Sequence, residues 1–244
     1  MNQIQIMLCS LVNLFDQTTW KEYFENLEQL IGSKLSHLDI NDPIRKKVSN
    51  LENAAAFVCN ISETENSRTL FAKFGKSKVE MTIILYRDTE HFANNVSIYF
   101  PEKYLSEDES RIQVINDVFM LSTENIKPFY AIGDSVQAIS EKRKASGFAV
   151  DLQAELIGVF WLTYLNKRYV EFFGECKFNQ LPYQNVTGGF LIKLGASPFS
   201  IEMGREDVEA LLGRESFVDP ELLFDKPIGK SALRFCEFKP SGSE

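Results

Sequence analysis

Apolar residues at helical spacing mark the first part of the chain. A helix is predicted from Thr18 or Thr19, either of which can cap it, to Gly32. Its apolar positions recur every three or four residues, at Trp20, Phe24, Leu27 and Ile31. Pro43 suits the first position of a second helix, which is predicted to run to about Ala56.

Acidic residues predict the start of a third helix within residues 106–109, because the helix dipole favours acids in a first turn. Its buried face is expected at Ile112, Ile115, Val118 and Phe119. Residues 128–133 predict a short strand, after which Asp134 or Ser135 can cap a small helix that reaches Lys142.

Extended runs predict most of the sheet. Residues 4–15 are moderately apolar and are predicted to form a first strand. Residues 69–75, 78–87 and 94–101 are rich in β-branched and aromatic residues and are separated by short polar turns, which is typical of consecutive antiparallel strands.

The second half of the chain continues the mixture of strands and helices. A continuous apolar run predicts a buried strand over 156–164, followed by a helix over 166–173 that Gly174 closes. A turn at 188–189 leads into another strand, residues 205–212 predict a helix, and residues 232–238 predict a last edge strand.

These elements indicate the α+β class, with a mostly antiparallel sheet flanked by helices. No Pro-, Gly- or Ser-rich linker and no internal repeat separates two folding units, so a single domain over residues 1–244 is expected. The polar stretch 141–147 is the best internal break. It leaves open two closely packed halves, at about 1–140 and 148–238.

The net charge of the chain indicates which kinds of partner it can attract. The formal net charge is −8 and the pI is about 5.0, whereas nucleic acids and anionic membranes attract clustered Lys and Arg. No apolar run approaches the roughly 20 residues that span a bilayer. We therefore expect no nucleic-acid or membrane partner, and a basic protein surface suits the chain better. The sequence also allows a homodimer.

Metal, cofactor and catalytic motifs are missing from the sequence. The four Cys residues form no CxxC pair and the chain has only two His, which argues against a metal site and for reduced thiols in the cytoplasm. Residues 133–136, GDSV, resemble the nucleophile block of GDS-type esterases, but no His follows residue 91 to accept the proton. No glycine pattern for phosphate binding is present, so the sequence predicts no cofactor and no enzyme activity.

Residues 154–175 are the densest run of aromatic and acidic side chains. Tyr169 shares a predicted helix face with Phe172 and Phe173, while Glu171 lies on the opposite side. An acidic edge flanked by Tyr tips suits a protein-binding patch, since Tyr anchors and carboxylates steer a basic partner. The predicted partner contacts are Glu155, Tyr164, Glu171 and Glu175, with Tyr169 as a weaker rim candidate. Trp161 is predicted to be a core anchor. The same run is also compatible with a well-packed strand and helix that bind nothing.

Five segments of this sequence are similar to the bacterial immunity protein 52 family. The segments are NNVSIYFPEKYL (94–105), KPFYAIGD (127–134), GVFWLTYLNKRYVEFFGE (158–175), GGFLIKLGASPF (188–199) and LLGRESFVDPE (211–221). The resemblance covers about residues 90–222. It implies an α+β protein that binds a polymorphic toxin made by the same bacterium and blocks it; in this family the toxin is often a predicted nuclease.

Three functions remain distinct at this point. The first is an immunity protein that neutralises a cognate toxin by direct binding. The second is a carboxylate-dependent hydrolase that uses the acids near Glu171 in an aromatic-lined cleft with Trp161. The third is a phage or mobile-element protein that binds a host defence protein, which shares the acidic surface with the first.

Overall fold

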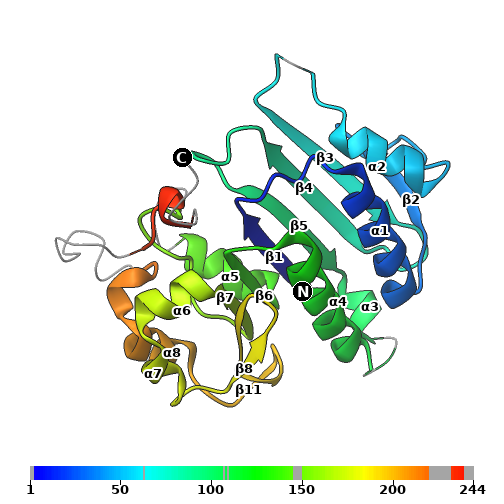
Figure 1. Ribbon diagram of the computed structural model, residues 1–244. Coiled ribbons are helices and arrows are strands. Elements are labelled where there is room, and N and C mark those ends of the chain that lie inside the picture. The colour runs from blue at the N-terminus through cyan, green and yellow to red at the C-terminus, as the bar shows by residue number, and fades with distance from the viewer. Residues whose placement is uncertain are drawn as a thin grey trace. The chain divides into compact units, whose positions relative to one another are not determined.

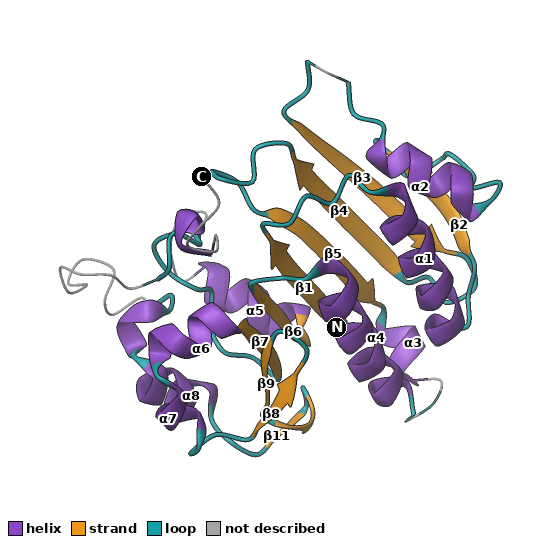
Figure 2. Cartoon of the chain, viewed as in Figure 1, coloured by secondary structure: helices purple, strands orange, loops and turns teal. Residues whose placement is uncertain are grey.

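The computed structural model describes residues 3–62, 64–106, 108, 110–144, 150–219 and 232–238. The chain divides into two compact units, Met1–Pro128 (unit 1) and Phe129–Glu244 (unit 2), each described by itself below. The border lies ahead of the break predicted at 141–147, of which residues 145–147 lie outside the described residues. The predicted α+β class, with antiparallel strands flanked by helices, is confirmed (Figure 2).

Unit 1 is an antiparallel sheet in the order β2-β3-β4-β5-β1. The strands are β1 (Ile4–Ser10), β2 (Leu35–Asp39), β3 (Ser67–Phe74), β4 (Glu80–Tyr86) and β5 (Asn94–Phe100). Alternate residues of β4 are buried, and its register places Ile83 opposite Val96 of β5. The three strands predicted over 69–101 are confirmed. The first strand ends at Ser10, earlier than predicted, and β2 was not predicted because only Leu35 and Leu38 of its five residues are apolar.

Helices cover one face of the unit 1 sheet (Figure 1). They are α1 (Gln17–Ile31), α2 (Leu51–Cys59), α3 (Glu102–Ser106) and α4 (Arg111–Ile126). The helix predicted from the period of Trp20 to Ile31 is confirmed, and Gly32 ends it in the left-handed conformation at φ 69°. Its cap is Asp16 and not Thr18 or Thr19, because the Asp16 carboxylate accepts the Thr19 N–H at 2.9 Å.

The prediction of a helix from Pro43 is wrong in its first half. The helix there is α2, which starts at Leu51 and is capped by Asn50, whose side chain accepts the Asn53 N–H at 2.8 Å. Residues 46–48 instead run beside β2: Leu38 N–H donates to the Lys46 carbonyl, and Val48 N–H donates to the Ser36 carbonyl, both at 3.0 Å. Backbone pairing with a strand excludes the helical conformation at these residues.

The long helix of unit 1 is α4. Ser110 is its N-cap residue. Of the four predicted buried positions, Ile115, Val118 and Phe119 are 0% exposed, whereas Ile112 is only half-buried. Two of the acids that marked its start in the sequence, residues 107 and 109, lie outside the described residues.

Unit 2 has a smaller antiparallel sheet in the order β6-β7-β9-β8. The strands are β6 (Tyr130–Ser135), β7 (Leu162–Asn166), β8 (Tyr183–Val186) and β9 (Gly189–Lys193), with a separate hairpin of β10 (Gly195–Ser197) and β11 (Ser200–Ile201). The helices are α5 (Val136–Lys144), α6 (Lys167–Phe173), α7 (Glu175–Phe178) and α8 (Arg205–Leu212), with 3-10 turns η1 (Arg214–Ser216) and η3 (Phe235–Phe238). The predicted helices at α5, α6 and α8 are confirmed.

Two strand predictions in unit 2 are corrected. The edge strand predicted at 232–238 is wrong, because residues 235–238 form the η3 turn. The strand predicted over 156–164 is wrong in its first part: β7 begins only at Leu162, and residues 156–161 form a buried segment with a single parallel bridge from Leu156 to Phe217. This segment organises the polar interior of unit 2.

Candidate functional site

The aromatic residues predicted near the site are buried. Trp161 is 0% exposed and its indole N–H donates to the Gly195 carbonyl at 3.0 Å, which agrees with its predicted role as a core anchor. Tyr164 is 3% exposed and Tyr169 is 0% exposed, so the prediction that they form Tyr tips at an exposed edge is wrong. Burial raises the pKa of the Tyr164 hydroxyl to about 12. Since these rings lie in the core, they do not line an open cleft.

The predicted acids lie on separate elements, and two of the three are exposed. Glu171 belongs to α6 and is paired with Arg168 at 3.5 Å, with 67% of its side chain exposed. Glu175 begins α7 and is exposed, while Glu155 is half-buried in the segment before β7. Three basic residues accompany the two glutamates on α6 and α7, namely Lys167, Arg168 and Lys177. The edge formed by Glu171 and Glu175 therefore carries mixed charge, contrary to the acidic edge that was predicted.

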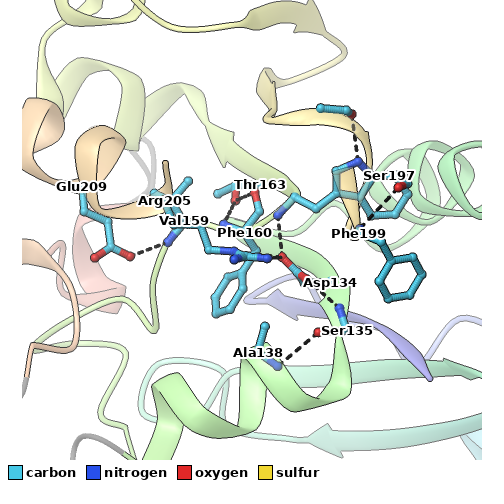
Figure 3. A network of polar contacts seen from close by, with 12 residues as sticks. Asp134, Ser135, Ala138, Val159, Phe160, Thr163, Ser197, Phe199, Arg205 and Glu209 are labelled. Carbon is cyan, nitrogen blue, oxygen red and sulfur yellow. Dashed lines mark hydrogen bonds and ion pairs between the residues drawn. The ribbon is translucent and has the colours of Figure 1, made fainter. Parts of the chain in front are cut away.

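The backbone of residues 156–161 runs through the interior of unit 2 largely without strand neighbours. Gly158 is buried and the other residues are at most 3% exposed, so the N–H groups of this segment need acceptors within the protein. Four successive N–H groups find side-chain oxygens: those of Gly158, Val159, Phe160 and Trp161. The acceptors are Tyr130, Glu209, Thr163 and Asp134, respectively. We call these four acceptors and residues 156–161 the polar clamp. Figure 3 shows the part of it around Asp134, Val159, Phe160, Thr163 and Glu209.

Asp134 forms the first charged part of the polar clamp. Its carboxylate is 0% exposed and accepts the Trp161 N–H at 2.8 Å. The Arg205 guanidinium donates to the same oxygen, at 3.2 Å from Nε and 2.7 Å from Nη2. A buried carboxylate is tolerated when charge and hydrogen bonds compensate it, and Asp134 has both. Arg205 starts α8, so this pair fixes one end of that helix to β6.

Glu209 forms the second charged part, one helical turn further along α8. Oε1 accepts the Val159 N–H at 2.9 Å, and Oε2 accepts Lys142 Nζ at 2.6 Å. Burial raises the pKa of Glu209, and the positive charge of Lys142 offsets part of that rise. The close approach requires Gly158, because a Cβ there would stand 2.8 Å from Glu209 Oε1 and 3.0 Å from Lys142 Cε.

Two hydroxyl groups complete the polar clamp. The Tyr130 hydroxyl donates to the Gly158 carbonyl at 2.5 Å and accepts the Gly158 N–H at 3.1 Å. The Thr163 hydroxyl accepts the Phe160 N–H at 2.8 Å and donates to the Phe160 carbonyl at 3.3 Å. Each hydroxyl thus serves both polar groups of one peptide residue, as a neighbouring strand would.

Sequence reasoning missed the polar clamp. The sequence presented Asp134 and Ser135 as part of GDSV and as alternative helix caps. The cap prediction is confirmed for Ser135, whose Oγ accepts the Ala138 N–H at 3.2 Å. Arg205 and Glu209 stand four residues apart on a predicted helix, which is an ordinary spacing for a surface ion pair. The signal that could have revealed them is the long apolar run at 156–161 with Gly158 inside it.

The polar clamp is suited to support structure. Both of its carboxylates are buried and occupied by donors, so the clamp offers no open carboxylate to a ligand. Within the described ranges, no three His, Cys, Asp or Glu side chains gather as metal ligands would. The helices of the same ranges include none with both the length and the apolar character needed to cross a membrane.

Unit 1 carries an acidic groove that the sequence did not single out. It has a volume of about 400 Å³ and lies between the first turns of α1 and the start of α2. Its lining residues are Gln17, Thr18, Lys21, Glu22, Glu25 and Glu52. Lys21 pairs with Glu52 at 2.9 Å, which leaves Glu22 and Glu25 as the exposed acids of α1 here. This surface is more acidic than the α6 and α7 edge.

Comparisons with known proteins support the fold. No family model matches the sequence, and no curated protein matches it. A solved structure described as "Pseudomonas aeruginosa T6SS protein PA0821" is similar with a TM-score of 0.59 and 17% sequence identity. The similarity covers 95% of this chain and 78% of that chain. At this identity the comparison establishes a shared fold.

Proposed function

We propose that this protein is an immunity protein that neutralises a cognate bacterial toxin by direct binding, in a setting of type VI secretion. The observation that carries the proposal is the fold shared with a T6SS protein over 95% of the chain. The resemblance of five segments to the immunity protein 52 family points the same way. A stoichiometric inhibitor needs a stable surface and no catalytic group, and the polar clamp holds its carboxylates buried and hydrogen-bonded to backbone.

Charge supports a basic partner. The net charge of −8 favours association with a basic protein, such as the cleft of a nuclease, and exposed carboxylates on a rigid helix can take the place of phosphate groups. Two surfaces of the described structure offer such carboxylates: Glu171 with Glu175 in unit 2, and Glu22 with Glu25 in unit 1. Cytoplasmic action on a toxin is part of the same proposal.

The test is to express the protein together with the toxin candidate encoded beside its gene. We expect a stable complex on size-exclusion chromatography and restored growth of cells that make the toxin. Full toxin activity in the presence of an equimolar amount of this protein would contradict the proposal. A neighbouring gene for a phage or host defence protein, and complex formation with that protein instead, would favour the mobile-element function.

Charge reversal then identifies the surface. The two test variants are E171K/E175K and E22K/E25K, and the matched control is E102K/E124K, which makes the same charge change at exposed positions of α3 and α4. The variant at the true contact should lower the association rate by roughly tenfold or more at low salt. An equal, small decrease in all three would show that only net charge matters.

A further inference from the structure

We propose that unit 1 binds a small amphipathic anion, a phosphate or carboxylate on an apolar body, in the cavity between α2 and the segment 46–49. The cavity has a volume of about 510 Å³, within the roughly 300–1,000 Å³ of cavities that hold small molecules. Its lining residues are Leu38, Lys46, Lys47, Val48, Ser49, Asn53, Ala54, Ala56, Phe57 and Asn60. This inference is independent of the proposed toxin binding, which needs a basic partner.

The lining has two chemically distinct parts. Leu38 and Ala54 form a buried apolar floor, 2% and 4% exposed, and Phe57 adds an aromatic wall. Lys46 and Lys47 contribute exposed ammonium groups. An apolar floor beside concentrated positive charge matches a ligand that carries a hydrophobic body and an anionic group.

An aromatic ring holds the positive charges in place. Lys46 Nζ lies 3.5 Å from the centroid of the Phe57 ring, and the Arg68 guanidinium carbon lies 4.8 Å from the same centroid. A ring attracts a cation through its quadrupole and leaves the full positive charge available to another partner. This arrangement differs from an ion pair, in which a carboxylate would neutralise the lysine.

Two acids near these lysines along the chain, Asp39 and Glu52, are engaged elsewhere. The Asp39 carboxylate accepts four backbone N–H groups, those of Ile40, Asn41, Arg45 and Lys46, and these hydrogen bonds lower its pKa. Glu52 on α2 pairs with Lys21. Across the described residues, no carboxylate forms an ion pair with Lys46 or Lys47. A chain of net charge −8 thus presents uncompensated positive charge around a cavity.

The test uses three probes: 1-naphthyl phosphate, uncharged 1-naphthol and inorganic phosphate. Isothermal titration with the full chain should give one site for 1-naphthyl phosphate, with much weaker binding of the other two. Amide chemical-shift changes should fall on residues 46–49 and on α2. Equal affinity for 1-naphthol, or shifts confined to other parts of the chain, would overturn the proposal.

Three variants sharpen the result. K46Q should weaken binding of 1-naphthyl phosphate by roughly tenfold or more, because a charge-assisted contact is lost. A56L should abolish it by filling the cavity, with an unchanged circular dichroism spectrum. K76Q removes the charge of an exposed lysine on a turn that does not line the cavity, and it should bind like the parent. Unchanged affinity in both K46Q and A56L would overturn the proposal.

Discussion

In unit 1 the buried backbone is paired mainly strand to strand, with a few bonds to side chains such as Leu35 N–H to Glu28, whereas in unit 2 the buried segment 156–161 is paired mainly to side chains. The register from β2 to β1 runs through consecutive antiparallel pairings, and apolar side chains fill the core between sheet and helices. Unit 2 has shorter strands and relies on Asp134 and Glu209 to bond its backbone. The comparison teaches that buried segments of one chain can have their backbone groups paired by very different partners.

The difference predicts which substitutions each unit tolerates. A ladder hydrogen bond does not depend on side-chain identity, so replacing a polar strand side chain of unit 1 that bonds no backbone group should have a small effect. In unit 2 a single carboxylate carries several hydrogen bonds, so its loss leaves several buried donors unsatisfied. Each unit has one buried tryptophan, Trp20 in unit 1 and Trp161 in unit 2, so fluorescence can follow each separately.

The largest expected effect is that of Asp134→Ala. Removing the carboxylate leaves the Arg205 guanidinium and the Trp161 N–H without their acceptor, which should lower the free energy of unfolding of unit 2 by roughly 3–5 kcal/mol. Guanidinium unfolding in a Trp20→Phe background, with Trp161 as the reporter, measures this loss.

The matched control for Asp134→Ala is Ser97→Ala in unit 1. The Ser97 hydroxyl is buried and bonds only to the side chains of Gln5 and Asn95 among the contacts described, so its loss should cost about 1 kcal/mol or less. In the Trp161→Phe background, Trp20 reports this change. Similar decreases in the free energy of unfolding for the two variants would contradict the proposed difference between the units.

A smaller effect is expected from adding one methyl group at Gly158. Its Cβ would lie 2.8 Å from Glu209 Oε1, so Gly158→Ala should destabilise unit 2 by roughly 1–3 kcal/mol. At Gly75 in unit 1 a Cβ would meet Ser36 Cβ at 3.5 Å, an ordinary contact, and Gly75→Ala should stay within about 0.5 kcal/mol of the parent. Urea unfolding measures the free energy of unfolding of both variants. An unchanged value for Gly158→Ala would show that the Glu209 side chain can move away to make room for the methyl group.

The smallest effect is the pH dependence that Glu209 gives to the stability of unit 2. Because burial raises the pKa of Glu209, the folded state holds this proton more tightly than the unfolded chain does. Stability should therefore fall as the pH rises above the ordinary value of 4.5, and should level off once the raised pKa is passed. Glu209→Gln cannot ionise, so the difference in unfolding free energy between parent and variant should follow this curve. A difference that does not change with pH would contradict the assignment.

The sequence predicted the regular elements of unit 1 better than the buried segment 156–161 of unit 2. The periods of α1, α4 and β3 to β5 are local signals, because each element buries one face of its own residues. Segment 156–161 gave a strand prediction because an apolar run indicates burial but not the identity of the hydrogen-bond partners. The partners that decide its conformation, Asp134 and Glu209, are remote in sequence.

The candidate contacts show the same limit. The helical period over 167–173 correctly placed Phe173 on the buried face and Glu171 outside, but it placed the Tyr169 hydroxyl at the rim, where the structure buries it. It could not show that Tyr164 is buried, nor that Lys167 and Arg168 balance the glutamates. The acidic groove of unit 1 escaped notice because Glu52 reaches it from a separate helix.

The Tyr130 and Thr163 hydroxyls have a consequence for the rate at which backbone amides exchange with deuterium. The amides of Gly158, Phe160 and Trp161 lie outside any strand, yet each donates to a buried side-chain oxygen. They should be protected as slowly exchanging strand amides are. Hydrogen exchange would thus show protection over residues 158–161 like that of a strand, although no strand is present there. Thr163→Val should speed exchange of the Phe160 amide first, because it removes that amide's acceptor.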